Sequence, residues 1–365
     1  MGCAHVRHYR SALLPAVPVR GGRDALRGHR EDRSLKVLIA NEADVHAMLP
    51  MDGCVALMRE ALISQFRVDA VLPLRSKMFL PDKSGLLGLM PGYLGTPRSF
   101  GLKVVSVMPG NHGTPYDSHQ GVVMLFGLEH GEPLAMMDAS AITAIRTAAA
   151  SGAATDALAN PDAGDLAIIG SGTQARTHLV AMKTVRRLRR IRIWSRSKAN
   201  AERFAHDNHH GEQPRIEVMD TAEAAVRGAD LVCTTTSAPE PVVKGAWLSP
   251  GAHINAAGAC FPHTRELDTE AVVRARLFTD CRESCENEAG GYRLPLAEGA
   301  ITSGHLLGEI GGVFIGELPG RTSPEEITLY ESLGIALEDL ASAHAIHRRA
   351  VETGTGTWVE WGGPA

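Results

Sequence analysis

The chain has 365 residues, of which 44% are hydrophobic and 21% are charged, and its formal net charge is -4. This length suggests two domains with substantial cores, and the composition is that of an ordinary soluble globular protein. The basic residues form no stripe interleaved with aromatic side chains, which argues against a nucleic-acid partner, and no apolar run reaches the roughly 20 residues of a membrane span.

The first 34 residues differ in kind from the rest of the chain. They contain seven arginines, no lysines and three acidic residues, which gives a local charge of 7 − 3 = +4. This segment contains several proline and glycine residues and has no helical or strand periodicity, which predicts a disordered extension. A misassigned start or a transit-like leader would explain the same composition. The absence of a signal-peptide core and the six scattered cysteines favour a reduced, cytoplasmic setting.

The segment from Leu35 to about residue 158 predicts an α+β arrangement. A first strand and a helix over 50–66 precede short apolar strands near 85–90, 101–108, 122–126 and 134–137. Turns rich in proline and glycine join these strands, which predicts a mostly antiparallel or mixed sheet. An alanine-rich helix over 142–158 follows, and Asn160-Pro161 ends it.

Beyond residue 160 the pattern alternates between strands and helices. We predict strands at 166–169, 191–194, 216–218, 230–234, 252–256 and 276–279, with helices at 173–186, 198–207 and 221–227. This alternation predicts a doubly wound parallel sheet of the Rossmann type, so the fold class is α/β. After about Gly311 the periodicity is helical, from Ser323 through Glu338 to His347, and we expect this segment to return to the first domain.

The most informative motif is a tight glycine turn that follows the strand at 166–169. It reads Gly170-Ser-Gly172-Thr173-Gln174-Ala175 and opens a helix. Gly170 permits the bend, Gly172 lets backbone N–H groups approach a pyrophosphate at the helix N-terminus, and Ala175 keeps the helix close to the sheet. The motif alone also fits a bare turn, but the second strand follows at the spacing at which a ribose is recognised. We therefore predict a dinucleotide site.

The residues after the second strand indicate which dinucleotide binds. An NAD site places Asp or Glu against the ribose 2′-hydroxyl, whereas this chain has Ser195, Arg196 and Ser197, followed by Lys198. Cationic and hydroxyl donors suit a 2′-phosphate, so NADP(H) is the predicted cofactor and NAD(H) the alternative. The competing interpretation is that these are solvated residues at a strand end. We interpret the histidine cluster at 206–210 as a solvated helix surface and predict no metal.

Three cations lie in apolar or turn-rich segments of the first domain: Arg75, Lys103 and Arg146. A cation on a buried segment needs a partner. If the three converge, they would hold the α-carboxylate of an amino or imino acid and present its Cα to the nicotinamide. Spacing alone does not show convergence, and each cation would also fit an ion pair or a surface group.

Several motifs resemble the ornithine cyclodeaminase and mu-crystallin family, which also contains archaeal-type alanine dehydrogenases and imino-acid reductases. The resemblance extends from about Leu35 to Arg348, with the motifs in the family's order. They include Gly88-Leu-Met-Pro-Gly-Tyr93, Gly101-Leu-Lys-Val-Val105, Ile142-Thr-Ala-Ile-Arg-Thr147, the glycine turn, His253-Ile-Asn-Ala-Ala-Gly258 and Ser332-Leu-Gly-Ile-Ala-Leu-Glu-Asp339.

The resemblance implies a homodimer whose substrate and dimerisation domain comprises residues 35–155 and 311–350, with a dinucleotide-binding domain at 156–310 and a tail at 351–365. It implies that Arg75, Lys103 and Arg146 bind the substrate carboxylate, that Lys103 also donates or accepts a proton, and that His119 meets the site. It further implies cofactor contacts by Thr147, Gln174, Ala175, Thr234, Thr236, Ala257, Glu288 and Ser332.

One departure from the family's pattern separates its branches. Cyclodeaminases carry an Asp that manages protons and water around Cα where this chain has Cys260, and a Lys where it has Thr264. A thiol with a pKa of ~8.5 is a poor substitute for that carboxylate. We therefore expect NADP(H)-dependent reduction of a cyclic or open-chain imino acid, or the reverse dehydrogenation. Two alternatives stay open: an ornithine cyclodeaminase in which Glu288 or a bound water takes the missing role, and a non-enzymatic NADP(H)-dependent binding protein.

Overall fold

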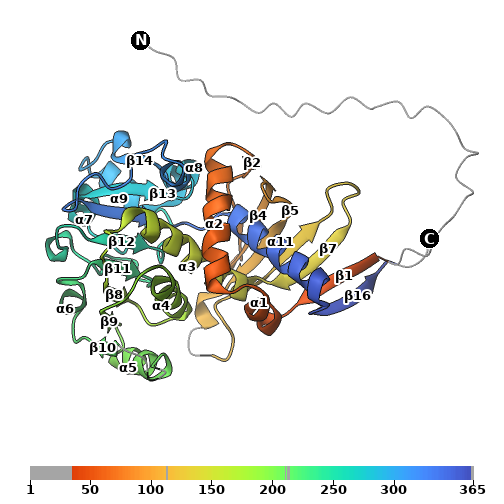
Figure 1. Cartoon of the computed structure of the whole chain (residues 1–365), viewed down its shortest axis with the longest axis horizontal. Coiled ribbons are helices and arrows are strands. Elements are labelled where there is room, and N and C mark those ends of the chain that lie inside the picture. Colours follow the sequence, from red (N-terminus) through yellow and green to blue (C-terminus); the bar gives the residue numbers. More distant parts are fainter. Residues whose placement is uncertain (1–34, 112–113, 210, 212–213, 363–365) are drawn as a thin grey trace, which may run out of the picture. The chain divides into compact units, whose positions relative to one another are not determined.

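Two sheets, each of eight strands, organise the computed structural model (Figure 1). The structure describes residues 35–111, 114–209, 211 and 214–362. The prediction of a disordered extension at 1–34 lies outside these residues. Residues 36–359 belong to one compact unit, and the cavity and site residues described below lie within it.

The first sheet is mixed, as the turns between its strands predict. Its order is β16-β1-β7-β6-β5-β4-β2, and β3 also pairs with β4. β1 and β7 are parallel, whereas the pairs from β7 to β2 are antiparallel. The strands are β1 (Leu35–Ala40), β2 (Ala70–Val71), β3 (Ser76–Phe79), β4 (Leu86–Gly95), β5 (Arg98–Val107), β6 (His119–Phe126), β7 (Pro133–Asp138) and β16 (Thr357–Trp361).

Helices α2 (Met51–Phe66), α3 (Ala139–Leu158) and α11 (Ala336–Thr353) pack together and, with the short α1 (Glu42–Met48), form a core with the first sheet. The Asp138 side chain caps α3 by accepting a hydrogen bond of 2.7 Å from the backbone N–H of Ala141. The alanine-rich sequence of α3 lets it be covered on several sides at once. It contacts both the first sheet and α4 (Thr173–Val185) of the nucleotide region, so its side chains reach both parts of the unit.

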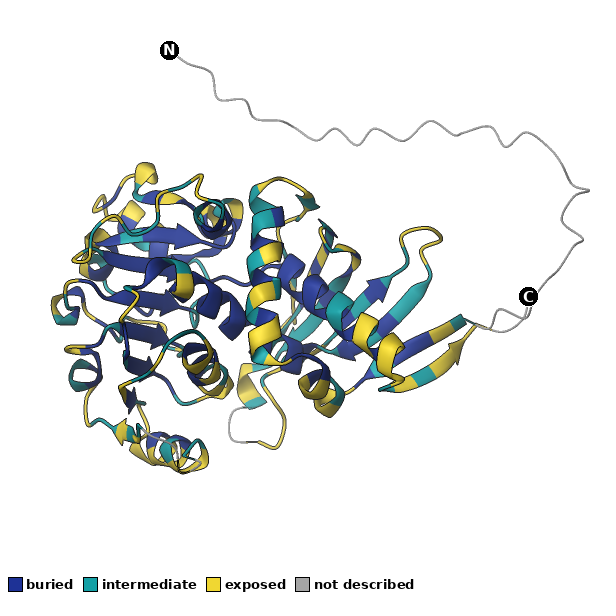
Figure 2. Cartoon of the chain, viewed as in Figure 1, coloured by how far each residue is buried: buried dark blue, intermediate teal, exposed yellow. Residues whose placement is uncertain are grey.

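The second sheet is entirely parallel, with the order β10-β9-β8-β11-β12-β15-β13-β14. Figure 2 shows its central strands in the dark blue of buried residues, which explains their continuous apolar sequences. Chain order reverses between β8 and β11, and ligands of such sheets bind at this switch point. The strands are β8 (Asp165–Ile169), β9 (Arg190–Trp194), β10 (Ile216–Val218), β11 (Leu231–Thr234), β12 (His253–Ala256), β13 (Ala275–Thr279), β14 (Leu306–Glu309) and β15 (Ile327–Glu331).

The predicted alternation of strands and helices between residues 166 and 279 is confirmed, but the helical prediction from Ser323 onwards is wrong over its first part. Residues 327–331 form β15, a fully buried strand between β12 and β13. A short apolar run does not reveal its own secondary structure, and the two neighbouring strands decide it here. The remaining helices are α5 (Lys198–Asp207), α6 (Ala222–Val226), α7 (Thr269–Arg274), α8 (Arg282–Glu288), α9 (Gly290–Ala297) and α10 (Ile310–Phe314), with 3-10 turns η1 (Pro109–Asn111), η2 (Gly245–Trp247) and η3 (Ser303–His305).

Among the described residues, none of the helices combines the length and apolar character needed to cross a bilayer. No group of three or more His, Cys, Asp or Glu side chains in the same ranges is arranged to hold a metal ion. The five cysteines that the structure describes are free thiols.

Candidate active site

A cavity of about 850 Å³ lies at the carboxyl ends of β8 and β11 and extends to the first sheet. Its walls include Met90 of β4 and Lys103 of β5 on one side, and Gly170 and Thr235, which follow β8 and β11, on the other. The cavity therefore joins the switch point of the parallel sheet to the first sheet, which is where a dinucleotide and a small substrate would meet.

The glycine turn leaves room for an anion at the start of α4. Gly170 has a φ of +115°, and a Cβ at this position would lie 2.7 Å from the carbonyl oxygen of Thr235, so only glycine fits. Gly172 is the N-cap of α4 without a side-chain cap, and a Cβ there would meet no atom within 4 Å. The first N–H groups of α4 can therefore bind a pyrophosphate.

Two further polar atoms lack a partner inside the described part of the chain. Gln174 Oε1 and Ser332 Oγ are buried without a hydrogen bond, and both residues line the cavity. A buried polar atom without a partner carries a desolvation cost, which a bound ligand would remove. The site thus fits a dinucleotide on three counts: the uncapped helix, the open glycine and these unpaired atoms.

The residues after β9 also face the cavity. Ser195, Arg196 and Ser197 line it, together with Asn200. The Ser171 hydroxyl donates to Ser195 Oγ at 2.9 Å, which joins the glycine turn to this segment. Lys198 is placed differently: its ammonium is exposed, 2.8 Å from Asp220 Oδ1, and it is not part of the wall.

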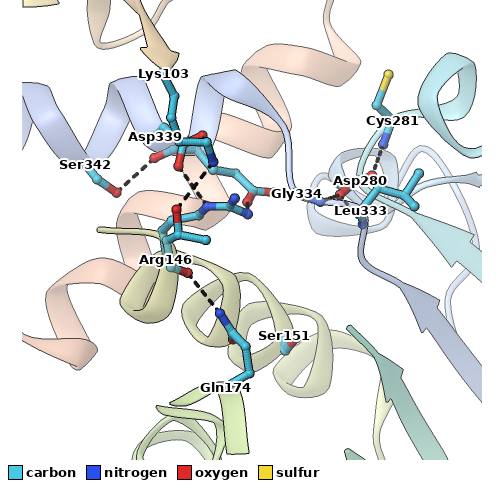
Figure 3. Close-up of polar contacts among 12 residues, drawn as sticks. Lys103, Arg146, Ser151, Gln174, Asp280, Cys281, Leu333, Gly334, Asp339 and Ser342 are labelled. Atoms are coloured by element: carbon cyan, nitrogen blue, oxygen red, sulfur yellow. Dashed lines mark hydrogen bonds and ion pairs between the residues drawn. The ribbon is translucent and has the colours of Figure 1, made fainter. Parts of the chain in front are cut away.

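The three cations that the sequence singles out lie on the wall of the same cavity. Lys103 Nζ lies 2.7 Å from Asp339 Oδ2, and Arg146 Nε lies 3.0 Å from Asp339 Oδ1 (Figure 3). Arg146 Nη1 also lies 2.6 Å from Glu338 Oε2. One carboxylate of α11 therefore bridges an ammonium from β5 and a guanidinium from α3.

Arg75 reaches the cavity from the segment before β3. Its Nε donates to Glu288 Oε2 at 2.8 Å, and its Nη2 donates to the carbonyl oxygens of Leu333 and Gly334 at 3.2 and 3.1 Å. Among the described residues, Arg75 Nη1 and Arg146 Nη2 have no hydrogen-bond partner. These two donors and the Lys103 ammonium are the groups that a substrate carboxylate would meet.

The loop between β15 and α11 positions this cluster. Asp280 Oδ2 accepts hydrogen bonds from the backbone N–H groups of Leu333 and Gly334 at 2.8 and 2.7 Å (Figure 3). Gly334 has a φ of +70°, and a Cβ there would clash with the guanidinium of Arg146. A left-handed glycine is therefore required for the loop to turn beside Arg146 and to lead into the acidic first turn of α11.

Burial and the neighbouring charges adjust the protonation of this cluster. Burial lowers the pKa of Lys103 to about 8, with the positive charges of Arg146 and Arg75 acting in the same direction and Asp339 opposing them. Burial likewise raises the pKa of Glu338 to about 8, partly opposed by Arg146. Burial would raise the pKa of Asp339 as well, but Arg146 and Lys103 outweigh it and the pKa is lowered. Lys103 is thus poised to exchange a proton near neutral pH beside a stable carboxylate.

His119 begins β6 and lines the cavity near Lys103. Its Nδ1 lies 3.0 Å from Ser118 Oγ. Burial lowers its pKa, and the Lys103 charge adds to this effect. The imidazole is therefore neutral at physiological pH and offers the cavity a hydrogen-bonding group without charge.

Most of the predicted site residues lie on the cavity wall, and three do not. Ala175 is fully buried within α4. Thr234 lies behind the wall, where its hydroxyl donates to Glu266 Oε2 at 2.8 Å. Glu288 also lies behind the wall, where its Oε2 accepts a hydrogen bond from Arg75 Nε. The predicted residues on the wall are Arg75, Lys103, His119, Arg146, Thr147, Gly170, Gly172, Thr173, Gln174, Ser195, Arg196, Ser197, Thr236, Ala257 and Ser332.

The sequence did not single out several residues of the site. Asp339 and Glu338 stand in a quoted motif, but nothing in their spacing reveals that they pair with Lys103 and Arg146. Glu266 accepts hydrogen bonds from the backbone N–H groups of Thr236 and Gly258 at 2.5 and 2.8 Å and so holds two cofactor-side loops together. Lys77 was also missed. It lies two residues after Arg75, at the start of β3, and in an extended segment this spacing of two places both side chains on one side, which was the available signal.

Comparisons with known proteins agree with this geometry. Residues 36–354 match the model of the ornithine cyclodeaminase/mu-crystallin family. The ketimine reductase mu-crystallin of Mus musculus is 38% identical over 275 residues, which cover 75% of this chain and 84% of that protein.

Two solved structures are similar over most of both chains. The Delta(1)-pyrroline-2-carboxylate reductase of Thermococcus litoralis, in complex with NADH and L-proline, aligns with a TM-score of 0.85 and 34% identity, covering 88% of this chain and 99% of that chain. An archaeal alanine dehydrogenase dimer with bound NAD aligns with a TM-score of 0.84 and 30% identity, covering 90% of this chain and 100% of that chain.

Proposed function

Because the chain belongs to the ornithine cyclodeaminase/mu-crystallin family, we propose that it is a pyridine-nucleotide-dependent oxidoreductase that reduces an imino acid to an amino acid, or catalyses the reverse dehydrogenation. One observation carries the proposal. Arg75, Lys103 and Arg146 line the cavity that also contains the uncapped N-terminus of α4. The reductase activities of the mouse and Thermococcus relatives point to the same chemistry.

The cations bind the substrate carboxylate. Arg75 Nη1 and Arg146 Nη2 are free to donate to it, because the other nitrogens of both guanidinium groups are held by Glu288, Glu338, Asp339 and two loop carbonyls. Donors that are already oriented lose little freedom when the substrate binds. The clamp thereby presents the imine carbon at a defined place in the cavity.

Lys103 supplies the proton. A reduced nicotinamide, when bound, supplies the hydride that reduces the C=N bond at Cα. The ammonium of Lys103 donates a proton to the imine nitrogen, so that addition of the hydride at Cα gives an amine whose nitrogen stays bonded to Cα. A pKa of about 8 suits this role, because the group is largely protonated at neutral pH and still gives up a proton readily. In the reverse direction the neutral amine of Lys103 accepts the proton.

We propose NADP(H) as the preferred cofactor. Ser195, Arg196 and Ser197 line the cavity after β9, and Arg196 is the cation of this group that would meet a 2′-phosphate. The segment carries no carboxylate that would bind a ribose 2′-hydroxyl. NAD(H), which the two solved relatives bind, remains the alternative cofactor.

We also propose a homodimer formed through the first sheet. The face of this sheet turned away from α11 exposes apolar side chains on neighbouring strands, including Met78 on β3, Leu89 on β4 and Phe100 on β5. Large apolar side chains exposed on neighbouring strands of one sheet face are typical of a protein interface. In this assignment residues 35–155 and α11 bind substrate and form the dimer, whereas the second sheet, with β15, binds the nucleotide.

The proposal is tested with NADPH and NADH in parallel, using cyclic imino acids and 2-oxo acids mixed with amines as substrates. We expect steady oxidation of the nucleotide with at least one imino acid. Ornithine without added reductant is the matched test of the cyclodeaminase alternative, which would release ammonia without net nucleotide turnover. Binding of NADPH without oxidation by any substrate of the panel would leave the binding-protein alternative and reject the reductase.

A further inference from the structure

On its substrate side, the cavity wall carries one more cation than the carboxylate clamp uses. Lys77 lies on β3 and lines the cavity beside Arg75. Its Nζ is 2.9 Å from Glu288 Oε1 and 5.1 Å from the centroid of the Phe261 ring, which is also part of the wall. Its side chain is 22% exposed. The ammonium therefore has a defined position on the wall and is not a freely moving surface group.

Positive charge dominates the substrate side of the cavity. The described residues that line it include Arg75, Lys77, Lys103 and Arg146, whereas Asp117 is the only acidic residue among them. Glu288, Glu338 and Asp339 do not line the cavity and lie behind the cations that they pair with. A ligand therefore meets the cations first.

The cations are not evenly matched by these carboxylates. Lys103 and Arg146 share two carboxylates, from Asp339 and Glu338. Arg75 and Lys77 share the single carboxylate of Glu288, one oxygen each. Both oxygens of Glu288 are thus already paired, and Lys77 is the cation at this end of the cavity that the clamp does not use.

We propose that Lys77 is a specificity-determining residue that excludes substrates with a cationic side chain and admits imino acids with neutral or acidic side chains. The inference rests on the proposed function. A cationic substrate group entering the cavity would lose its hydration, would find each buried carboxylate already paired, and would face the Lys77 ammonium across a region of low dielectric. A neutral side chain pays no such cost, and an acidic one gains a partner.

Asp117 is the acidic residue of the described cavity wall that bears on this discrimination. Asp117 is exposed in the segment before His119, whereas Lys77 projects from β3. If Asp117 bound a cationic side chain, the repulsion by Lys77 would be offset. A variant of Asp117 therefore belongs in the test.

The experiment compares three 2-oxo acids with ammonia or methylamine and NADPH: those corresponding to norvaline, glutamate and arginine, whose side chains are neutral, anionic and cationic. In the wild type we expect kcat/KM for the neutral substrate to exceed that for the cationic one by at least about tenfold. Lys77→Met should reduce this ratio by about tenfold, because the side chain keeps its length and loses its charge. Lys77→Arg keeps the charge and should keep the ratio.

Lys244→Met is the matched control. Lys244 also lies over an aromatic ring, at 5.7 Å from the centroid of Trp247, but it is not on the cavity wall. This variant should leave the ratio unchanged. An equal ratio in Lys77→Met and the wild type, or a ratio that changes in Asp117→Asn and not in Lys77→Met, would overturn the proposal.

Failure of the proposed function gives a different result. If no substrate supports nucleotide oxidation, the reductase proposal fails. Lys77 is then tested separately by the binding of L-norvaline, L-glutamate and L-arginine to the complex of the protein with NADPH. Binding is measured as quenching of the fluorescence of the bound NADPH. Weaker binding of L-arginine that is relieved by Lys77→Met would support the charge discrimination, and binding of all three amino acids with the same affinity would reject it.

Discussion

Replacing Asp339 by Asn removes one charge from the centre of the cluster and keeps the size of the side chain. Asp339 is fully buried, and its two oxygens lie 2.7 Å from Lys103 Nζ and 3.0 Å from Arg146 Nε. Burial lowers the pKa of Lys103, and the negative charge of Asp339 is the largest effect that raises it. An opposite charge at such short range changes a pKa by about 1–3 units. The pKa of Lys103 should therefore fall by at least about one unit in the variant.

The direction of the activity change follows from the role of Lys103. Reduction requires the protonated form, so the activity is lost as the pH rises through the Lys103 pKa of about 8. A pKa lower by about one unit moves this alkaline limb to lower pH and reduces kcat/KM at pH 8 by about fivefold. Each further unit by which the pKa falls reduces kcat/KM at pH 8 by about another tenfold.

The assay is the pH dependence of kcat/KM for imine reduction at saturating NADPH. Glu338→Gln is the matched control, because Glu338 pairs with Arg146, whereas the partners of Lys103 among the described residues are Asp339 and Thr143. It also tests whether Glu338, whose pKa is likewise about 8, produces the limb. The other groups around Lys103 are Arg75, Arg146, His119 and Thr143, and they stay unchanged in both variants.

The refuting result is an alkaline limb of Asp339→Asn that coincides with that of the wild type, or a limb that moves in Glu338→Gln alone. Loss of one partner from a buried ion cluster also costs about 3–5 kcal/mol of stability. Thermal unfolding of each variant therefore sets the temperature at which the kinetics are measured, so that a folding defect is not mistaken for a change in the pKa.

Three further predictions follow from the same geometry. Lys103→Ala should lower kcat for reduction by about 10²–10⁴-fold while NADPH still binds, and activity equal to the wild type would remove Lys103 from the mechanism. Arg196→Ala should raise the KM for NADPH by about tenfold or more through the loss of a charged hydrogen bond. The KM for NADH, measured by the same steady-state kinetics, should change little. Equal losses with both nucleotides would argue against a contact between Arg196 and a 2′-phosphate. Gly334→Ala should destabilise the protein by about 1–3 kcal/mol and raise the KM for the imino acid, because the new Cβ displaces Arg146. Gly299→Ala, at a similar φ of +71° but in open space, is its control in denaturant unfolding, and equal kinetics in both variants would contradict the displacement.

Local patterns in the sequence were sufficient for the nucleotide region. The alternation of apolar strands with helices and the Gly170–Ala175 turn depend on residues a few positions apart, and the structure confirms the predicted strands and helices between residues 166 and 279. Reliance on local patterns also explains why residues 327–331 were wrongly predicted to be helical. β15 took its strand conformation from β12 and β13, which lie on either side of it in the sheet and far from it in the sequence.

By itself the amino-acid sequence determined the fold class and the family resemblance, and it singled out the three cations that line one cavity in the structure. Only the tertiary structure decided how those cations are held. The bridge from Lys103 to Arg146 through Asp339 joins β5, α3 and α11. The single carboxylate of Glu288, at the end of α8, pairs with both Arg75 and Lys77. The energies of such contacts depend on distance and burial between segments far apart in the chain, and periodicity carries no information about either.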